Sequence, residues 1–376
     1  MKRPRNRALD YLVYLFARLL VCVLQALSVE QSYAFAKFLA SILYRVDTRH
    51  RRVGMENLQA AFGDRYTEAE RDAIVRGVYE HFCMMLMEIM HIPRKLHHET
   101  WRDRITLVGH EKVLDRMLAG GPVILLTGHF GNWEMAGYLF GVFGFPPRSV
   151  ARTLDNPYLD RFLREFRERT GQKMIPKNGG YDDMLETLRH GGVLSFLADQ
   201  DAGQNGLYVD FFGRPASTHK AIALLAIEHK APVVIGYARR IGPGFRYEVG
   251  CPEIIDPADL PGAADDVREL TQRFTTAIEQ VIRRNPEQYL WLHRRWKHQP
   301  KKRGKKFTTE PTESPEKTQR AKESESVRNP QFSDQARPSG HVSLFSFSGF
   351  LSVFSVTSVV KSLRSIFRTL LQLARS

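Results

Sequence analysis

The spacing of apolar and polar residues alternates along this chain between patterns typical of strands and patterns typical of helices. Short apolar runs rich in β-branched residues predict buried strands at residues 123–127, 149–152, 173–175, 193–198, 233–239 and 246–251. Segments with helical spacing of apolar residues lie between them, at 132–142, 158–170, 181–190 and 218–229, and a last helix spans about 265–284. This alternation predicts an α/β fold with a mostly parallel sheet flanked by helices.

Residues 30–121 have a helical pattern instead. Thr67 and Glu70 form a capping-box pattern, which predicts a helix that runs to Ile92 and is stopped by Pro93. A methionine cluster near its end suits core filling, and the alternative is an acyl-chain groove; it comprises Met84, Met85, Met87 and Met90. On the helix at 158–170, three arginines point away from the apolar face, either as a solvated face or as a docking site for an acidic protein; they are Arg161, Arg164 and Arg167.

The N-terminal segment, residues 1–29, is apolar from about residue 9 and follows a basic start. It has no secretory cleavage site, so we expect a retained membrane-anchoring helix with its basic end cytoplasmic. Its length suits a membrane span, but its polar residues share one side of the helix: Asp10, Tyr14, Arg18, Gln25 and Ser28. An arginine at the bilayer centre costs about 2.5–3.5 kcal/mol, which an interfacial or docked helix avoids. Spanning and interfacial placements both remain open, and an ordinary core helix is the third alternative.

Composition divides the rest of the chain. Residues 30–300 carry the predicted catalytic domain, 301–340 read as a disordered linker, and 341–376 as an apolar and basic membrane-surface tail. The net charge of +14 favours anionic membranes or polyanions. No nucleic-acid-binding motif is present. The three cysteines are far apart and indicate buried thiols in a reducing compartment.

The strand at 123–127 carries the candidate chemistry. It ends in Thr127-Gly128, His129 follows directly, and Glu134 comes five positions later. A histidine at this edge of a sheet can act as a general base, and we expect Glu134 to orient its ring. No nucleophile lies beside them, so the nucleophile would be a hydroxyl of the substrate. The alternative is a histidine bonded to nearby backbone. A metal site is disfavoured because His-Glu-x-x-His spacing and Cys-x-x-Cys pairs are absent from the sequence.

The His129–Glu134 segment resembles the His-x4-Asp/Glu motif of the bacterial lipid A biosynthesis acyltransferases. Four further segments resemble that family in order and spacing: 57–62 (NLQAAF), 151–157 (ARTLDNP), 197–203 (LADQDAG) with 211–218 (FFGRPAST), and 286–297 (PEQYLWLHRRWK). Together they cover about residues 1–300.

The resemblance implies an O-acyltransferase that moves a fatty acyl chain from a thioester to a hydroxyl of a lipid A precursor. The backbone N–H groups near Gly131 and Asn132 are expected to stabilise the oxyanion, by their place at a helix start. The resemblance further implies that Arg152, Asp199 and Asp201 position donor or acceptor; the alternative is a strand-end ion pair and a turn. It implies no cofactor, an acyl carrier protein as donor, and a place on the cytoplasmic side of the bacterial inner membrane. Acyl-CoA is also an anionic thioester, so charge does not choose between the donors.

Two other functions remain open. One is acylation of another membrane glycolipid or aminolipid with acyl-CoA, as in the related mannoside acyltransferases. The other is a non-catalytic, membrane-surface protein that binds lipids.

Overall fold

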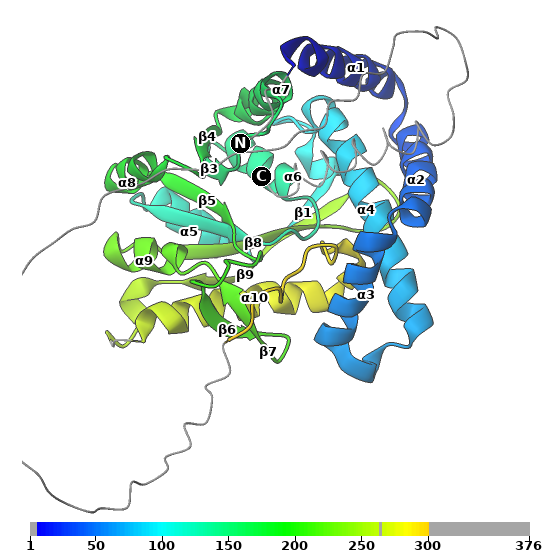
Figure 1. The fold of residues 1–376 in the computed structure, drawn as a ribbon. Coiled ribbons are helices and arrows are strands. Elements are labelled where there is room, and N and C mark those ends of the chain that lie inside the picture. Colours follow the sequence, from blue (N-terminus) through cyan, green and yellow to red (C-terminus); the bar gives the residue numbers. More distant parts are fainter. Residues whose placement is uncertain (1–5, 263–264, 301–376) are drawn as a thin grey trace, which may run out of the picture.

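A seven-stranded mixed sheet forms the centre of the protein (Figure 1). The computed structural model describes residues 6–262 and 265–300, so the predicted linker and tail at 301–376 lie outside the described residues. The strand order is β1-β9-β8-β2-β5-β3-β4. The strands are β1 (Ile105–Val108), β2 (Val123–Thr127), β3 (Arg148–Ala151), β4 (Lys173–Pro176), β5 (Val193–Leu197), β8 (Val233–Arg240) and β9 (Tyr247–Ile255).

The prediction of a mostly parallel sheet is confirmed. β8, β2, β5, β3 and β4 are mutually parallel, whereas β9 runs antiparallel to β8 and carries β1 parallel to itself at the edge. Six predicted strands match within a few residues. The sequence pattern did not reveal β1 or the separate antiparallel hairpin of β6 (Leu207–Phe211) and β7 (Arg214–Thr218).

Helices cover both faces of the sheet, as the burial of β2 requires. Val123 and Leu125 pack in one cluster with Met117 of α5, while Ile124 and Leu126 belong to the larger core on the other face. A strand buried on both faces must read as a continuous apolar run. The helices of this domain are α5 (Glu111–Leu118), α6 (Trp133–Val142), α7 (Pro157–Arg167), α8 (Tyr181–Arg189), α9 (Ala221–Glu228) and α10 (Asp266–Arg284).

Four helices precede the sheet and pack along one side of it (Figure 1). They are α1 (Arg7–Ala26), α2 (Val29–Val46), α3 (Thr48–Phe62) and α4 (Glu68–Lys95). The capping box of Thr67 and Glu70 starts α4 as predicted. However, α4 does not stop at Pro93 but continues to Lys95. A proline so near the end removes a single N–H donor from the last turns, so the helix tolerates it.

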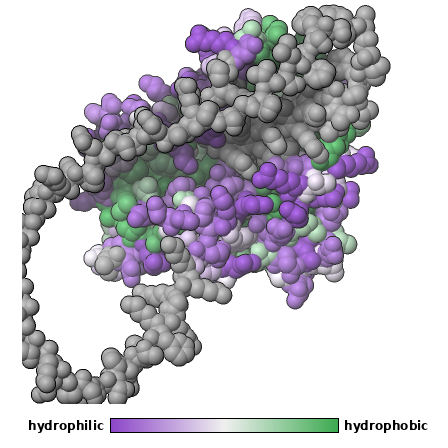
Figure 2. All heavy atoms as spheres, in the orientation of Figure 1, coloured by the Kyte–Doolittle hydropathy of each residue, from purple (hydrophilic) through white to green (hydrophobic). Residues whose placement is uncertain are grey.

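The polar side of α1 faces the protein and its apolar side does not. Asp10 is 8% exposed, the Asn156 side chain donates to its backbone oxygen (2.9 Å), and Gln25 donates to the carbonyl of Met90 (3.1 Å). Tyr14 also packs against the ring of Tyr158 of α7. The opposite side of α1 is exposed, and part of it is visible as green spheres at the top of Figure 2; it carries Leu9, Leu12, Phe16, Leu19 and Val23.

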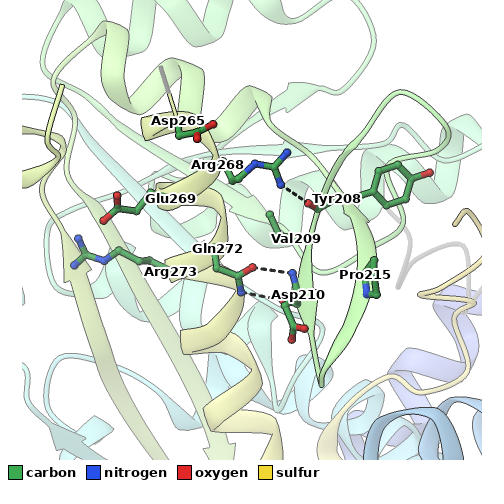
Figure 3. Close-up of a pocket in the computed structure, with 9 residues that line it drawn as sticks. All are labelled: Tyr208, Val209, Asp210, Pro215, Asp265, Arg268, Glu269, Gln272 and Arg273. Carbon is green, nitrogen blue, oxygen red and sulfur yellow. Dashed lines mark hydrogen bonds between the residues drawn. The ribbon is translucent and has the colours of Figure 1, made fainter. Parts of the chain in front are cut away.

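The β6–β7 hairpin is held on α10. The Gln272 amide bonds both the N–H and the carbonyl of Asp210, and Arg268 donates to the carbonyl of Tyr208 (Figure 3). These contacts fix the hairpin that follows the 199–203 segment, and so help to position the end of β5.

Candidate active site

Two adjacent parallel strands deliver the central pair of residues to the same edge of the sheet. Thr127 of β2 is in register with Leu197 of β5. The next backbone group of the β5 chain, the N–H of Ala198, donates to the carbonyl of Thr127 (3.0 Å). The residues that follow each strand, His129 and Asp199, therefore leave the sheet side by side. This is the carboxyl edge at which α/β proteins usually bind ligands.

Asp199 binds the His129 ring and backbone together. The Nδ1 of His129 lies 2.6 Å from Oδ1 of Asp199, and the backbone N–H of His129 donates to Oδ2 (2.8 Å). Both side chains are buried, at 4% and 3% exposed. Burial alone would raise the pKa of Asp199, but the charge and hydrogen bonds of His129 outweigh it and lower that pKa to about 2. An ionised Asp199 accepts a proton-bearing Nδ1–H, which leaves Nε2 with its lone pair. That is the tautomer a general base needs.

Glu134 does not make the contact expected of it. Both of its carboxylate oxygens accept from Arg167 of α7, at 2.8 and 2.5 Å, and in the described part of the chain no hydrogen bond or ion pair joins it to His129. Asn132 caps α6 through the N–H of Met135, so the helix starts at Trp133. Glu134 in its first turn is then directed toward α7. The ring of His129 packs on Trp133 instead, with the ring centroids 5.2 Å apart.

This pair also corrects the interpretation of Arg167 as part of a solvated face. Its side chain is 10% exposed and lies inside the protein with Glu134. Arg161 and Arg164 are 81% and 38% exposed at their side chains, and each pairs with an acidic residue one turn away on α7. Two of the three predicted surface arginines are therefore at the surface, and the third is structural.

The N–H groups of Gly131 and Asn132 are already used within the protein. Gly131 donates to the carbonyl of Gln288 (3.0 Å) and Asn132 to that of Ala238 (2.8 Å). They are therefore unavailable as the oxyanion donors expected from the sequence. Gly131 has φ of 60°, and a Cβ there would lie 1.9 Å from the Ala238 oxygen. Only glycine permits this approach of the loop to β8.

A buried ionic network holds the other side of the loop. Glu88 of α4, 1% exposed, accepts from the Arg240 Nε (2.8 Å) and from the Asn132 amide (2.9 Å). The hydroxyls of Tyr33 and Tyr247 also donate to it. His81 bonds the carbonyl of Gly131 (3.0 Å) and the Arg240 guanidinium (2.9 Å). The loop after β2 is therefore fixed from α4 and from β8.

Most of the segments that resembled the family, though not 151–157, are connected to this loop. The Leu290 N–H donates to the carbonyl of His129 (3.0 Å), which ties the 286–297 segment to the site. The Asn57 amide donates to the carbonyls of Trp291 and His293, both at 2.6 Å. Buried Arg295 donates to the carbonyl of Ser217 (2.6 Å), which connects the 211–218 segment. Segments more than 200 residues apart in sequence thus build one site.

Arg152 and Asp201 have local partners. Arg152 is 46% exposed at its side chain and pairs with Asp155 at 3.3 Å. The carboxylate of Asp201 binds His298 Nδ1 (2.6 Å) and accepts the N–H of Gly203 (3.2 Å). Both contacts match the alternative of a strand-end ion pair and a turn. Gln200 lies between the two aspartates, and its amide nitrogen is 3.2 Å from Nε2 of His129. The sequence analysis assigned it no role, although its position in the 197–203 segment could have indicated one.

His129 is 3% exposed and lines neither of two open pockets on the described part of the protein. One of about 430 Å³ lies between the β6–β7 hairpin and α10 (Figure 3). Another of about 460 Å³ lies beside α3. A cavity of about 20 Å³, room for one water, is lined by Arg152 and Arg167, so it adjoins the Glu134–Arg167 pair.

A mostly parallel α/β sheet with a buried histidine–carboxylate pair at its carboxyl edge is an arrangement suited to an enzyme that uses general-base catalysis. The chain belongs to the bacterial lipid A biosynthesis acyltransferase family, whose model matches residues 2–298. It is an acyltransferase, and family membership makes transfer of an acyl chain to a glycolipid its activity.

Its relatives have two kinds of acceptor in their names. It is 28% identical over 231 residues to a phosphatidylinositol mannoside acyltransferase of Mycobacterium tuberculosis, covering 60% of this chain and 71% of that one. It is 26% identical over 269 residues to the lipid A biosynthesis lauroyltransferase of Escherichia coli, covering 70% and 84%. It is 27% identical over 253 residues to the lipid A biosynthesis myristoyltransferase of the same organism, covering 66% and 75%.

Proposed function

We propose that this enzyme transfers a fatty acyl chain from an acyl carrier protein to a hydroxyl of a lipid A precursor, with His129 as general base. The observation that carries the mechanism is the buried contact between His129 Nδ1 and Asp199 at 2.6 Å. It fixes the tautomer with a free lone pair on Nε2 and stabilises the imidazolium that forms when the ring takes a proton.

In this mechanism the acceptor hydroxyl gives its proton to Nε2 of His129 while its oxygen attacks the thioester carbonyl. The tetrahedral oxyanion then collapses, the C–S bond breaks, and the imidazolium returns the proton to the leaving sulfur. The backbone N–H groups of Trp133 and Glu134, in the first turn of α6, are the oxyanion donors we propose. Within the described residues neither donates a hydrogen bond to another group, and the helix start favours negative charge.

The identity of donor and acceptor is supported by charge and by relatives. A net charge of +14 suits an acidic carrier protein and an anionic lipid. Relatives named lauroyl- and myristoyltransferases of lipid A biosynthesis match over 84% and 75% of their own lengths. The second candidate acceptor is a phosphatidylinositol mannoside, because the mycobacterial relative is 28% identical.

We also propose that α1 lies in the plane of the inner membrane, on its cytoplasmic face. By length and composition alone, α1 could cross a membrane. Its polar side, however, is docked through Asp10 and Gln25 on the catalytic domain, while Leu12 and Leu19 on the other side are 61% and 64% exposed. An amphipathic helix so held buries its apolar side in the headgroup region without moving Arg18 into the bilayer centre.

Transfer is tested with purified full-length protein, radiolabelled acyl carrier protein or acyl-CoA thioesters, and lipid A precursor or phosphatidylinositol mannoside, followed by mass analysis. His129→Ala should reduce transfer by at least about 10³-fold, since it removes the base, with an unchanged circular dichroism spectrum. Near-normal transfer by His129→Ala would refute the assignment of His129 as general base. Preference for acyl-CoA or for the mannoside would replace the proposed donor or acceptor and leave the base assignment standing.

Membrane placement is tested by binding to anionic vesicles. Leu12→Glu with Leu19→Glu should weaken partitioning by at least about 100-fold, since the two leucines together lose at least about 3 kcal/mol of burial. Leu118→Glu, at a position 68% exposed on α5, is the matched control and should bind like the wild type. Equal binding by both variants would remove the interfacial placement of α1.

A further inference from the structure

Gln200 lies against the one atom of His129 that the mechanism needs. Its amide nitrogen is 3.2 Å from Nε2 of the imidazole. Because Asp199 holds the proton on Nδ1, Nε2 carries the lone pair, and the Gln200 amide donates to it. In the absence of substrate, this N–H therefore occupies the direction from which a substrate O–H would approach.

The backbone on both sides of Gln200 is fixed. Asp199 is held by the N–H and the ring of His129. Asp201 is held by His298 and by the Gly203 N–H. The Gln200 side chain is half-buried, and rotation about its own side-chain bonds would move the amide away from Nε2.

We propose that Gln200 is a placeholder for the acceptor hydroxyl, which keeps water from Nε2 of His129 until the acceptor displaces it. This inference rests on the proposed function, in which Nε2 is the base. A thioester donor bound without acceptor is exposed to a wasteful reaction. Water attacks the carbonyl carbon, its proton passes to Nε2, the C–S bond breaks, and the sulfur leaves with the proton from the imidazolium. The products are a free fatty acid and the carrier thiol. An amide donor on Nε2 blocks the water that this reaction needs.

The test measures thiol release from an acyl-carrier thioester by full-length enzyme, with and without acceptor lipid, alongside acylated lipid by mass analysis. Gln200→Ala should raise acceptor-free thiol release about five- to tenfold, the equivalent of one hydrogen bond to displace. Gln200→Met should do the same, since it keeps the length and removes the donor. Gln204→Ala, an exposed glutamine in the same loop, is the matched control and should behave like the wild type.

A pH profile separates a placeholder from a structural residue. Gln200→Glu puts a carboxylate beside Nε2 and stabilises the protonated ring, so the acid limb of kcat/KM should move to higher pH by about one unit. Acceptor-free thiol release equal to wild type in Gln200→Ala and Gln200→Met, or an unmoved acid limb in Gln200→Glu, would overturn the proposal. His129→Ala separates the base role of His129 from the placeholder role of Gln200. If it abolishes transfer while the Gln200 variants resemble the wild type, only the placeholder role is refuted. If it retains transfer, the assignment of His129 as the base fails, and the placeholder role fails with it.

Discussion

Replacing Asp199 by asparagine should inactivate the enzyme without unfolding it. The substitution keeps the volume and removes the charge. One oxygen remains to accept from the His129 N–H, so the amide nitrogen then faces Nδ1. A donor at that place forces the ring proton to Nε2, which is the wrong tautomer for a base. The effect follows from the two contacts of 2.8 and 2.6 Å that Asp199 makes with one residue.

The magnitude has two parts. The pKa of Asp199 falls from 3.8 to about 2, which corresponds to about 2 kcal/mol of preference for the ionised form beside His129. If the imidazolium gains as much in the transition state, loss of the charge costs about 50-fold in kcat. The tautomer change adds to this, because the same replacement in the catalytic triad of a serine protease lowers kcat by about 10⁴-fold. We therefore expect a loss of about 10³- to 10⁴-fold in kcat, between the charge effect alone and the full triad effect.

Glu134→Gln provides the contrast, because sequence spacing assigned the orienting role to that residue. It breaks a buried pair whose side chains are 10% and 9% exposed and leaves the Arg167 charge unpaired, which should cost about 3–5 kcal/mol of unfolding free energy. Its activity should fall together with its melting temperature and recover in part when the assay is cooled.

The assay combines kcat from acyl-lipid mass analysis with thermal unfolding of each variant. Asp182→Asn, at an exposed position on α8, controls for loss of a carboxylate elsewhere. The reasoning is refuted if folded Glu134→Gln loses about 10³-fold in kcat while Asp199→Asn stays within about tenfold of wild type. That result would return the orienting role to Glu134.

Two further predictions concern stability. Glu88→Gln or Arg240→Met should each lower the unfolding free energy, measured by urea denaturation, by about 3–5 kcal/mol. The control is Arg52→Met, which breaks an ion pair whose side chains are 71% and 65% exposed and should cost less than about 1 kcal/mol. Equal costs for the buried and the exposed pair would contradict the role of the buried network. Burial of the His81 ring, and secondly the positive charge of Arg240, lower the pKa of His81 from 6.5 to about 3. Between these two pH values the unfolded chain therefore binds a proton that the folded chain does not. Stability should therefore fall as pH decreases from 6.5 toward 3, by up to about 1.4 kcal/mol per pH unit for this group; His81→Gln should flatten that slope, and an unchanged slope would exclude His81 as its source.

Local patterns predicted most of the sheet because its central strands are buried on both faces. The run at 123–127 is apolar for this reason, and its neighbour β8 is also largely buried. By contrast, β1 has only four residues, and the β6–β7 hairpin has strands of five residues with Pro215 inside the second one. Short segments with little apolar periodicity give no reliable strand pattern.

The candidate site was only partly accessible to sequence reasoning. His129 follows an unmistakable strand, so its place at the sheet edge could be derived. Its carboxylate partner could not, because β5 pairs with β2 although β3 and β4 come between them along the chain. Spacing favoured Glu134, five residues away. The start of α6 at Trp133 and the burial of Arg167 decide that contact, and neither can be read from spacing.

The loop after β2 is held by two buried carboxylates with different tasks. Asp199, on the β5 side, binds the ring and backbone of His129 and leaves the lone pair on Nε2. Glu88, on the α4 side, binds Asn132 and Arg240, and Arg240 in turn holds His81 on Gly131. The backbone N–H groups of Gly131 and Asn132 donate to the carbonyls of Gln288 and Ala238. The loop is therefore rigid, but these two groups cannot serve as oxyanion donors. The oxyanion must then be stabilised by groups outside the loop, which is why the first turn of α6 becomes the place where a bound thioester analogue should be sought.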